Sequence, residues 1–194
     1  MSARLFVAVE VGEGDREALA AWAREAVGDD AGLRLVPPDH IHLTLAFLGH
    51  RALDEVQPLS ALVERWDGAP APALRTAGAL WLSPRRPHVL TVAVEDRTAA
   101  LAELHDAVWT ALEDEADPPI RRERRAFRPH LTVARVRRGW PPPARRLPEL
   151  PARDLDAGGL VLFRSWLGGG PRDGEGAHGA RYEPLARAVL SARS

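Results

Sequence analysis

The chain has 194 residues, of which 45% are hydrophobic and 27% charged, a composition typical of a folded globular protein. Its net charge of -1 excludes a general electrostatic attraction to nucleic acid, so any RNA contact must come from a local group of cations. The absence of cysteine excludes disulfides, thiol nucleophiles and cysteine zinc sites. No stretch approaches the roughly 20 apolar residues of a membrane span, and we expect a cytoplasmic protein.

The first elements follow from apolar spacing. Residues 5–9 are valine-rich and apolar on both faces, which predicts a buried strand. A helical stripe follows, for which Asp15 is the expected N-cap and Gly28 the expected stop. The stretch LRLVPP, residues 33–38, predicts a short strand that is halted by two prolines.

The stretch HLTLAFLG, residues 42–49, predicts a strand with two unlike faces. Side chains alternate along a strand with a period of two. Strict alternation therefore gives a core face, made of Leu43, Leu45 and Phe47, and an opposite face, made of His42, Thr44 and Ala46.

The remaining pattern continues the alternation of strands and amphipathic helices, without a linker that would separate domains. We therefore expect a single domain over residues 1–194. The predicted helices cover residues 56–66 and a segment from about Asp96 to before Pro118; the predicted strands are 71–82, 88–95, 130–136, 158–167 and 180–190. The last two strands form an expected antiparallel pair, joined by a glycine-rich loop at 168–179.

The pentapeptide HLTLA at His42 recurs as HLTVA at His130, with leucine exchanged for valine at one position. Each copy follows a proline closely and begins a predicted strand, and each half of the chain offers strands and an amphipathic helix. This repeat predicts two similar α+β lobes, related by a pseudo-two-fold axis, that bring the two His-x-Thr strands to face each other across a cleft.

Two facing histidines can serve as a general base and a general acid at neutral pH, because their ordinary pKa lies near about 6.5. The pair suits in-line displacement at phosphorus, where one imidazole activates water and the other protonates the departing oxygen. Thr44 and Thr132 lie two residues further on the same faces, so their hydroxyls can donate to phosphate oxygens. This chemistry requires neither a metal nor another cofactor.

Two other functions stay open. His40 and His42 form an H-x-H pair that could ligate a metal in a metal-dependent phosphoesterase, although Arg128 replaces the first histidine in the second copy. The chain could also be a nucleotide- or RNA-end-binding module without turnover. His105, on the apolar face of its helix, is expected to be a hydrogen-bonded core residue.

Arg135 and three aromatic residues are further candidates for the expected site. An arginine beside the second motif could hold a phosphate through two hydrogen bonds. Strict alternation places Arg135 opposite His130 and Thr132, so it reaches the cleft only if the strand twists, bulges or ends there. Phe47, Trp140 and Trp166 are candidates for stacking on a base.

These residues resemble the 2H phosphoesterase superfamily, which is defined by two H-x-T-x motifs, here HLTL at 42–45 and HLTV at 130–133. Within it, the chain is most similar to the bacterial and archaeal RNA 2′,3′-cyclic phosphodiesterases, which were first called 2′-5′ RNA ligases. The stretches RLFVAVE, VPPDHIHLTLAFLG, FRPHLTVAR and LFRSWLG carry the resemblance over nearly the whole chain.

The resemblance implies a bilobal α+β fold and hydrolysis of RNA 2′,3′-cyclic phosphate ends, or of nucleoside cyclic phosphates, to 2′-phosphomonoesters. It assigns His42 as the general acid, His130 as the base, Thr44 and Thr132 as phosphate-binding residues, and Arg135 as a substrate-binding residue. It implies no cofactor and no metal, and the reverse reaction would join RNA ends through a 2′-5′ linkage. We expect a monomer. The 168–179 loop, with Arg172 and His178, is longer than is usual in the family.

Overall fold

The computed structural model describes residues 1–82, 87–137, 139–140, 146–167 and 180–191, and the 168–179 loop lies outside the described residues. Within them the strands are β1 (Ser2–Val11), β2 (Leu33–Leu35), β3 (His42–Ala52), β4 (Leu74–Leu82), β5 (Val89–Asp96), β6 (His130–Val136), β7 (Asp154–Leu155), β8 (Ala157–Leu167) and β9 (Ala180–Val189). The α-helices are α1 (Glu13–Val27), α2 (Val56–Glu64) and α3 (Ala100–Asp114), and two short 3-10 turns span Pro38–His40 and Leu53–Glu55.

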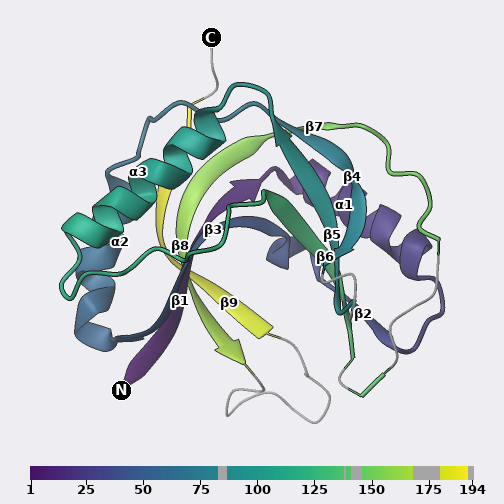
Figure 1. The fold of residues 1–194 in the computed structure, drawn as a ribbon, viewed down its shortest axis with the longest axis horizontal. Helices are drawn as coiled ribbons and strands as arrows, with labels where there is room; N and C mark the ends of the chain where they lie inside the picture. The colour runs from purple at the N-terminus through teal and green to yellow at the C-terminus, as the bar shows by residue number, and fades with distance from the viewer. Residues whose placement is uncertain (83–86, 138, 141–145, 168–179, 192–194) are drawn as a thin grey trace.

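One curled antiparallel sheet runs through the described part of the chain in the order β7-β4-β5-β6-β3-β1-β8-β9, with β2 added beside β6. The order is nearly symmetric about its centre. One lobe contains β3, β1, β8 and β9, and the other contains β6, β5, β4 and β7. Figure 1 shows the two lobes curving away from the central strands β3 and β6. The predicted bilobal α+β fold is therefore confirmed, and β8 and β9 form the expected antiparallel pair.

The helices cover the outside of the sheet (Figure 1). α2 packs against β8 and β9, and α3 packs against β3 and β5. α1, which follows β1 in sequence, instead packs against β2 and β6 of the other lobe. The lobes are thus interleaved in sequence, and neither one corresponds to a half of the chain.

Two expected helix starts are corrected by the structure. Asp15 is not an N-cap, because α1 begins at Glu13 after Gly12 and the buried Asp15 carboxylate accepts hydrogen bonds from Arg153 and from the Asp156 backbone N–H. α3 begins at Ala100 rather than near Asp96. The Asp96 carboxylate instead accepts hydrogen bonds from the first turn of α3. Gly28 does end α1, as predicted.

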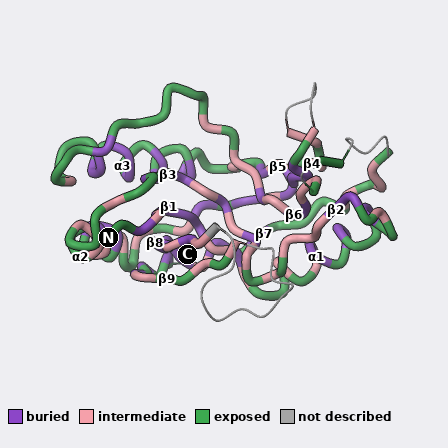
Figure 2. Tube along the Cα trace, turned by 90° about the horizontal axis from the view of Figure 1, so that it is seen from below, coloured by how far each residue is buried: buried purple, intermediate pink, exposed green. Residues whose placement is uncertain are grey.

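The core lies between the sheet and the helices, and a second, smaller apolar cluster lies on the opposite face. Figure 2 shows the buried central strands with more exposed helices at either end. The main core includes Leu43, Leu131 and Leu162, none of which is exposed. The smaller cluster contains Phe6 and Phe163. One face of the sheet therefore supports the fold, while the other is available to form a site. No helix of the described residues is long and apolar enough to cross a membrane.

Candidate active site

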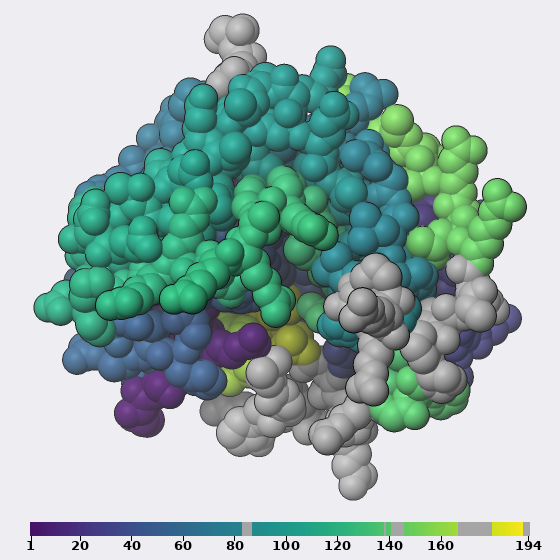
Figure 3. All heavy atoms as spheres, in the orientation of Figure 1, coloured from purple at the N-terminus to yellow at the C-terminus, as the bar shows by residue number. Residues whose placement is uncertain are grey.

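The inner face of the sheet is hollowed into a cleft of about 660 Å³. The space-filling view shows the surface hollowed between the lobes (Figure 3). Both histidines and both threonines of the repeated motif line this cleft, as does Arg135. The structure thus brings together all five residues that the sequence predicted: His42, Thr44, His130, Thr132 and Arg135.

The two motif strands are neighbours in one sheet, and they do not form opposite walls of the cleft as expected. β3 and β6 pair in an antiparallel direction at Leu43 and Leu131. One residue further along in this register, His42 lies beside Thr132 and Thr44 lies beside His130. Side chains directly opposite in a sheet have Cβ atoms about 5 Å apart, and diagonal neighbours are about 7 to 8 Å apart. The diagonal pair of histidines therefore leaves room for a phosphate group between them.

Each motif strand carries a bulge at the same position of the repeat. On β3, Thr44 pairs with Ala8 and Ala46 pairs with Val7, which leaves Leu45 as the extra residue. On β6, the register shift with β5 falls between Thr132 and Ala134. A bulge places two consecutive side chains on one side of a strand and reverses the alternation beyond it.

Burial confirms this reversal in both copies. Val133 and Ala134 are consecutive and fully buried, and Leu45 and Ala46 are also both buried. The next residue of each copy, Arg135 or Phe47, consequently faces the cleft. Arg135 thus reaches the site through a bulge.

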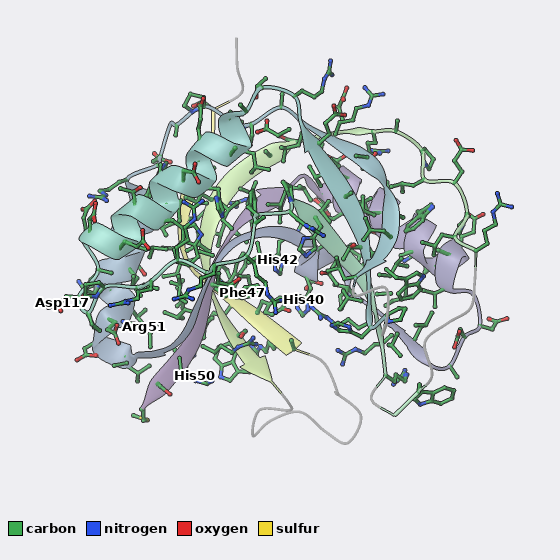
Figure 4. The ribbon with its side chains drawn as sticks, viewed as in Figure 1. His40, His42, Phe47, His50, Arg51 and Asp117 are labelled. Atoms are coloured by element: carbon green, nitrogen blue, oxygen red, sulfur yellow. The ribbon has the colours of Figure 1, made fainter. Side chains whose placement is uncertain are left out.

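Phe47 was predicted to face the core, and this prediction is wrong. Its side chain is 52% exposed and lines the cleft, while Ala46 occupies the core side. The error arises because strict alternation does not include the bulge. In Figure 4, His42, Phe47 and His40 gather at the centre of the molecule, whereas Arg51 and Asp117 lie far to one side.

Backbone carbonyls orient the two histidine rings. The Nδ1 atom of His130 lies 2.7 Å from the Arg128 carbonyl oxygen. A carbonyl can only accept, so Nδ1 carries the hydrogen and Nε2 of the neutral ring is left as a proton acceptor. The His42 ring is likewise hydrogen-bonded to the backbone of His40, two residues before it. The two copies therefore hold their rings in the same way.

The electrostatic environment of His42 favours the neutral ring. Burial removes water from the imidazolium and lowers the pKa of His42 from 6.5 to about 4. The hydrogen bond to the His40 backbone opposes this change, and the positive charges of His40, Arg135 and His130 add to it. An anion bound between these groups would reverse their effect and stabilise the protonated ring.

A family model described as the 2′-5′ RNA ligase superfamily matches residues 14–164 of this chain. The chain belongs to this superfamily. The match confirms the resemblance to the 2H phosphoesterases, and it includes both histidine motifs. The chain is thus an enzyme of the 2H phosphoesterase superfamily.

Several known proteins are similar to this chain over most of their length. An Archaeoglobus fulgidus protein named RNA 2′,3′-cyclic phosphodiesterase is 29% identical over 138 residues, covering 71% of this chain and 75% of that protein. A crystal structure of a Thermus thermophilus protein is 29% identical with a TM-score of 0.76, covering 96% of this chain and 97% of that one. The structure of E. coli LigT complexed with 3′-AMP is 25% identical with a TM-score of 0.73, covering 98% and 99%.

In this 2H phosphoesterase, aromatic side chains surround His42, and the sequence did not predict this cluster. The Phe6 ring stacks on His42 with centroids 4.9 Å apart, and Phe163 lies 5.7 Å from the same ring. Tyr182 meets His42 edge-on at 5.2 Å and also contacts His40 at 4.7 Å. These side chains come from strands that are separated in sequence from His42, and no pattern within any one strand shows that they contact it. They account for the burial of His42.

The other candidate residues that the structure describes do not line the cleft. Trp140 and Trp166 do not line the described cleft, and Trp166 is covered by Arg164 at 4.6 Å. His105 is a buried residue that stacks on Phe127 at 3.9 Å, as expected for a core histidine. Arg172 and His178 lie outside the described residues.

The metal alternative has limited support in the described residues. His40 contributes to the cleft, where Asp39 lies 3.8 Å from its ring. Among the described residues, no group of three or more His, Asp or Glu side chains is placed to hold a metal ion.

Proposed function

We propose that this protein hydrolyses RNA 2′,3′-cyclic phosphate ends to 2′-phosphomonoesters, with His42 and His130 as the acid and base. The observation that carries the proposal is the crossed placement of two H-x-T motifs in one cleft, each histidine beside the other motif's threonine. The 2′,3′-cyclic phosphodiesterase name of the Archaeoglobus fulgidus relative supports this choice of substrate.

The reaction needs one proton removed and one proton delivered. Nε2 of His130 accepts a proton from water as the water oxygen bonds to phosphorus, and the bond from phosphorus to the 3′ oxygen breaks. His42 then protonates the 3′ oxygen, which leaves the phosphate on the 2′ oxygen. The acid and base roles follow the family resemblance, because the two motifs are nearly identical in sequence.

The remaining cleft residues stabilise the negative charge that develops on the phosphate. The hydroxyls of Thr44 and Thr132 donate to nonbridging oxygens from either side, and Arg135 supplies a guanidinium that can donate two hydrogen bonds. The phosphate charge also raises the low pKa of His42, so that the bound substrate itself favours the protonated acid.

The test is product analysis with a short RNA that ends in a 2′,3′-cyclic phosphate, incubated in EDTA. Wild type should release a 2′-phosphate end. His42→Ala and His130→Ala should each lower kcat by at least about 100-fold while binding of the RNA is largely kept. His50→Ala is the matched control, because His50 is an exposed histidine of β3 that does not line the cleft.

The second function left open by the sequence, binding without turnover, makes a different prediction. A binding module would release no product, and the histidine variants would change only the affinity for RNA. Formation of a 3′-phosphate end would contradict the assigned leaving group. Activity that disappears in EDTA would favour the metal-dependent alternative.

A further inference from the structure

A second cation lies beside Arg135 in the cleft. Arg34 on β2 and Arg135 on β6 are direct cross-strand partners, and both line the cleft. Like charges placed opposite each other destabilise a sheet, because the two side chains leave the strands in the same direction. Such a pair is favourable only when an anion lies between or beside the two guanidinium groups.

No carboxylate neutralises this arginine pair within the described residues. The described cleft lining contains neither Asp nor Glu. The arginines that form ion pairs within the described residues are others: Arg51, Arg65, Arg75, Arg97, Arg122, Arg153 and Arg187. Arg34 and Arg135 are also half-buried, so both charges are partly removed from water. The local excess of positive charge contrasts with the net charge of -1 for the whole chain.

The position of Arg34 separates it from the reacting phosphate. β3 meets β6 at Leu131, within the motif, whereas β2 pairs with β6 beyond the bulge, at residues 134–136. Arg34 is therefore level with Arg135 along β6, beyond Thr132 and further still from His130. One phosphate held between the two histidines uses Arg135, and it leaves Arg34 for a second anion.

We infer that Arg34 binds the internal phosphodiester that precedes the cyclic phosphate. The preferred substrate is then an oligonucleotide end with at least two nucleotides, rather than a lone nucleoside cyclic phosphate. This inference rests on the proposed function, because it takes the cyclic phosphate to be bound between His42 and His130. An arginine suits this role because its planar guanidinium donates two hydrogen bonds to one phosphate.

The experiment compares three substrates, two of which are dinucleotides that differ only in the internal linkage. They are a nucleoside 2′,3′-cyclic phosphate, a dinucleotide ending in the same cyclic phosphate, and that dinucleotide with a neutral methylphosphonate linkage. Wild type should show a kcat/KM on the phosphodiester dinucleotide at least about tenfold above that on the methylphosphonate. Arg34→Gln should remove this difference in kcat/KM. Arg34→Lys keeps the positive charge but lacks the planar guanidinium, so it should keep part of the difference.

Arg4→Gln is the matched control, because Arg4 lines the cleft on β1 and has no carboxylate partner among the described residues. It should leave the ratio between the two dinucleotides unchanged. If Arg4→Gln lowered this ratio as much as Arg34→Gln does, the inference would be overturned, because the overall positive potential of the cleft would then account for the preference. Equal turnover of both dinucleotides by wild type would also overturn it while leaving the proposed function intact. Failure of wild type to cleave any of the three substrates would overturn the proposed function itself.

Discussion

Leu43 on β3 and Leu131 on β6 are cross-strand partners at the centre of the sheet, and both are fully buried. The pseudo-two-fold axis of the repeat passes between them, which is why His42 lies beside Thr132 and His130 beside Thr44. The apolar residues of the motif thus fix the geometry of its polar residues. Each His-x-Thr motif is incomplete alone, and the pairing of two copies builds one phosphate-sized site.

The crossed arrangement predicts similar roles for the two threonines. Thr44→Val and Thr132→Val each remove one hydroxyl donor and keep the side-chain shape, so each should lower kcat/KM on a cyclic phosphate by about 10- to 100-fold. Steady-state kinetics of the two variants test this directly. Thr91→Val is the control, because the Thr91 hydroxyl donates to the Leu80 carbonyl oxygen outside the cleft. A loss confined to one of the two motif variants would contradict the two-fold arrangement.

The sixth residue of each copy makes the site asymmetric. The bulge turns both Phe47 and Arg135 toward the cleft, so one position offers a cation and the other an aromatic ring. We expect Phe47 to stack on the terminal base. Phe47→Ala should then raise KM by about tenfold or more with a small change in kcat, since base stacking contributes about 1 to 3 kcal/mol.

Phe47→Tyr keeps the ring and serves as the control for this prediction. Its KM should stay close to that of wild type. A fall in kcat with an unchanged KM in Phe47→Ala would instead mean that the ring positions the catalytic groups rather than the base.

Much of the site followed from the sequence because a repeated pentapeptide is a local signal. The repeat identified His42, His130 and their threonines, and the apolar spacing located the elements that carry them. The bulges were not predictable, because a bulge depends on hydrogen bonds to the neighbouring strand, which a single-strand pattern does not contain. The orientations of Phe47 and Arg135 depended on that missing information.

The interleaving of the lobes could not be predicted from the sequence either. Amphipathic spacing shows that α1 has an apolar face, but it does not show which strands cover that face. Asp15 illustrates the same limit, because its hydrogen-bond partners Arg153 and Asp156 come from the far end of the chain. The aromatic wall beside His42 likewise depends on Tyr182, which only the pairing of β8 with β9 brings near.

The two-histidine mechanism predicts that chelators have no effect. Activity on a cyclic phosphate should stay within about twofold of its starting value after extended dialysis against EDTA, because protons and fixed donors act on the phosphate. His40→Ala distinguishes the metal alternative further. If a metal were bound by His40 and His42, activity would be lost both after dialysis against EDTA and in His40→Ala. Added divalent ions would then restore the activity of the dialysed protein.

The low pKa of His42 predicts a loss of stability in mild acid. The folded protein keeps His42 neutral down to about pH 4, whereas the unfolded chain protonates it near pH 6.5. Because the folded pKa is the lower one, the unfolded state binds more protons between these values, and stability falls as the pH falls through this window. From pH 7 to pH 5 this single group should lower the free energy of unfolding by about 2 kcal/mol.

Denaturant unfolding of wild type and His42→Gln at pH 7 and pH 5 measures this contribution as a difference between the two proteins. The ionisable groups around His42 remain in both proteins, namely His40, His130, Arg135 and Tyr182. Glu10, the cross-strand partner of His42 on β1, also remains and pairs with Arg187. Wild type should lose about 2 kcal/mol more than the variant over this range. An equal loss in both proteins would show that the aromatic cluster does not keep the imidazole neutral. Bound inorganic phosphate should reduce the difference, because an anion beside His42 raises its pKa toward that of the unfolded chain.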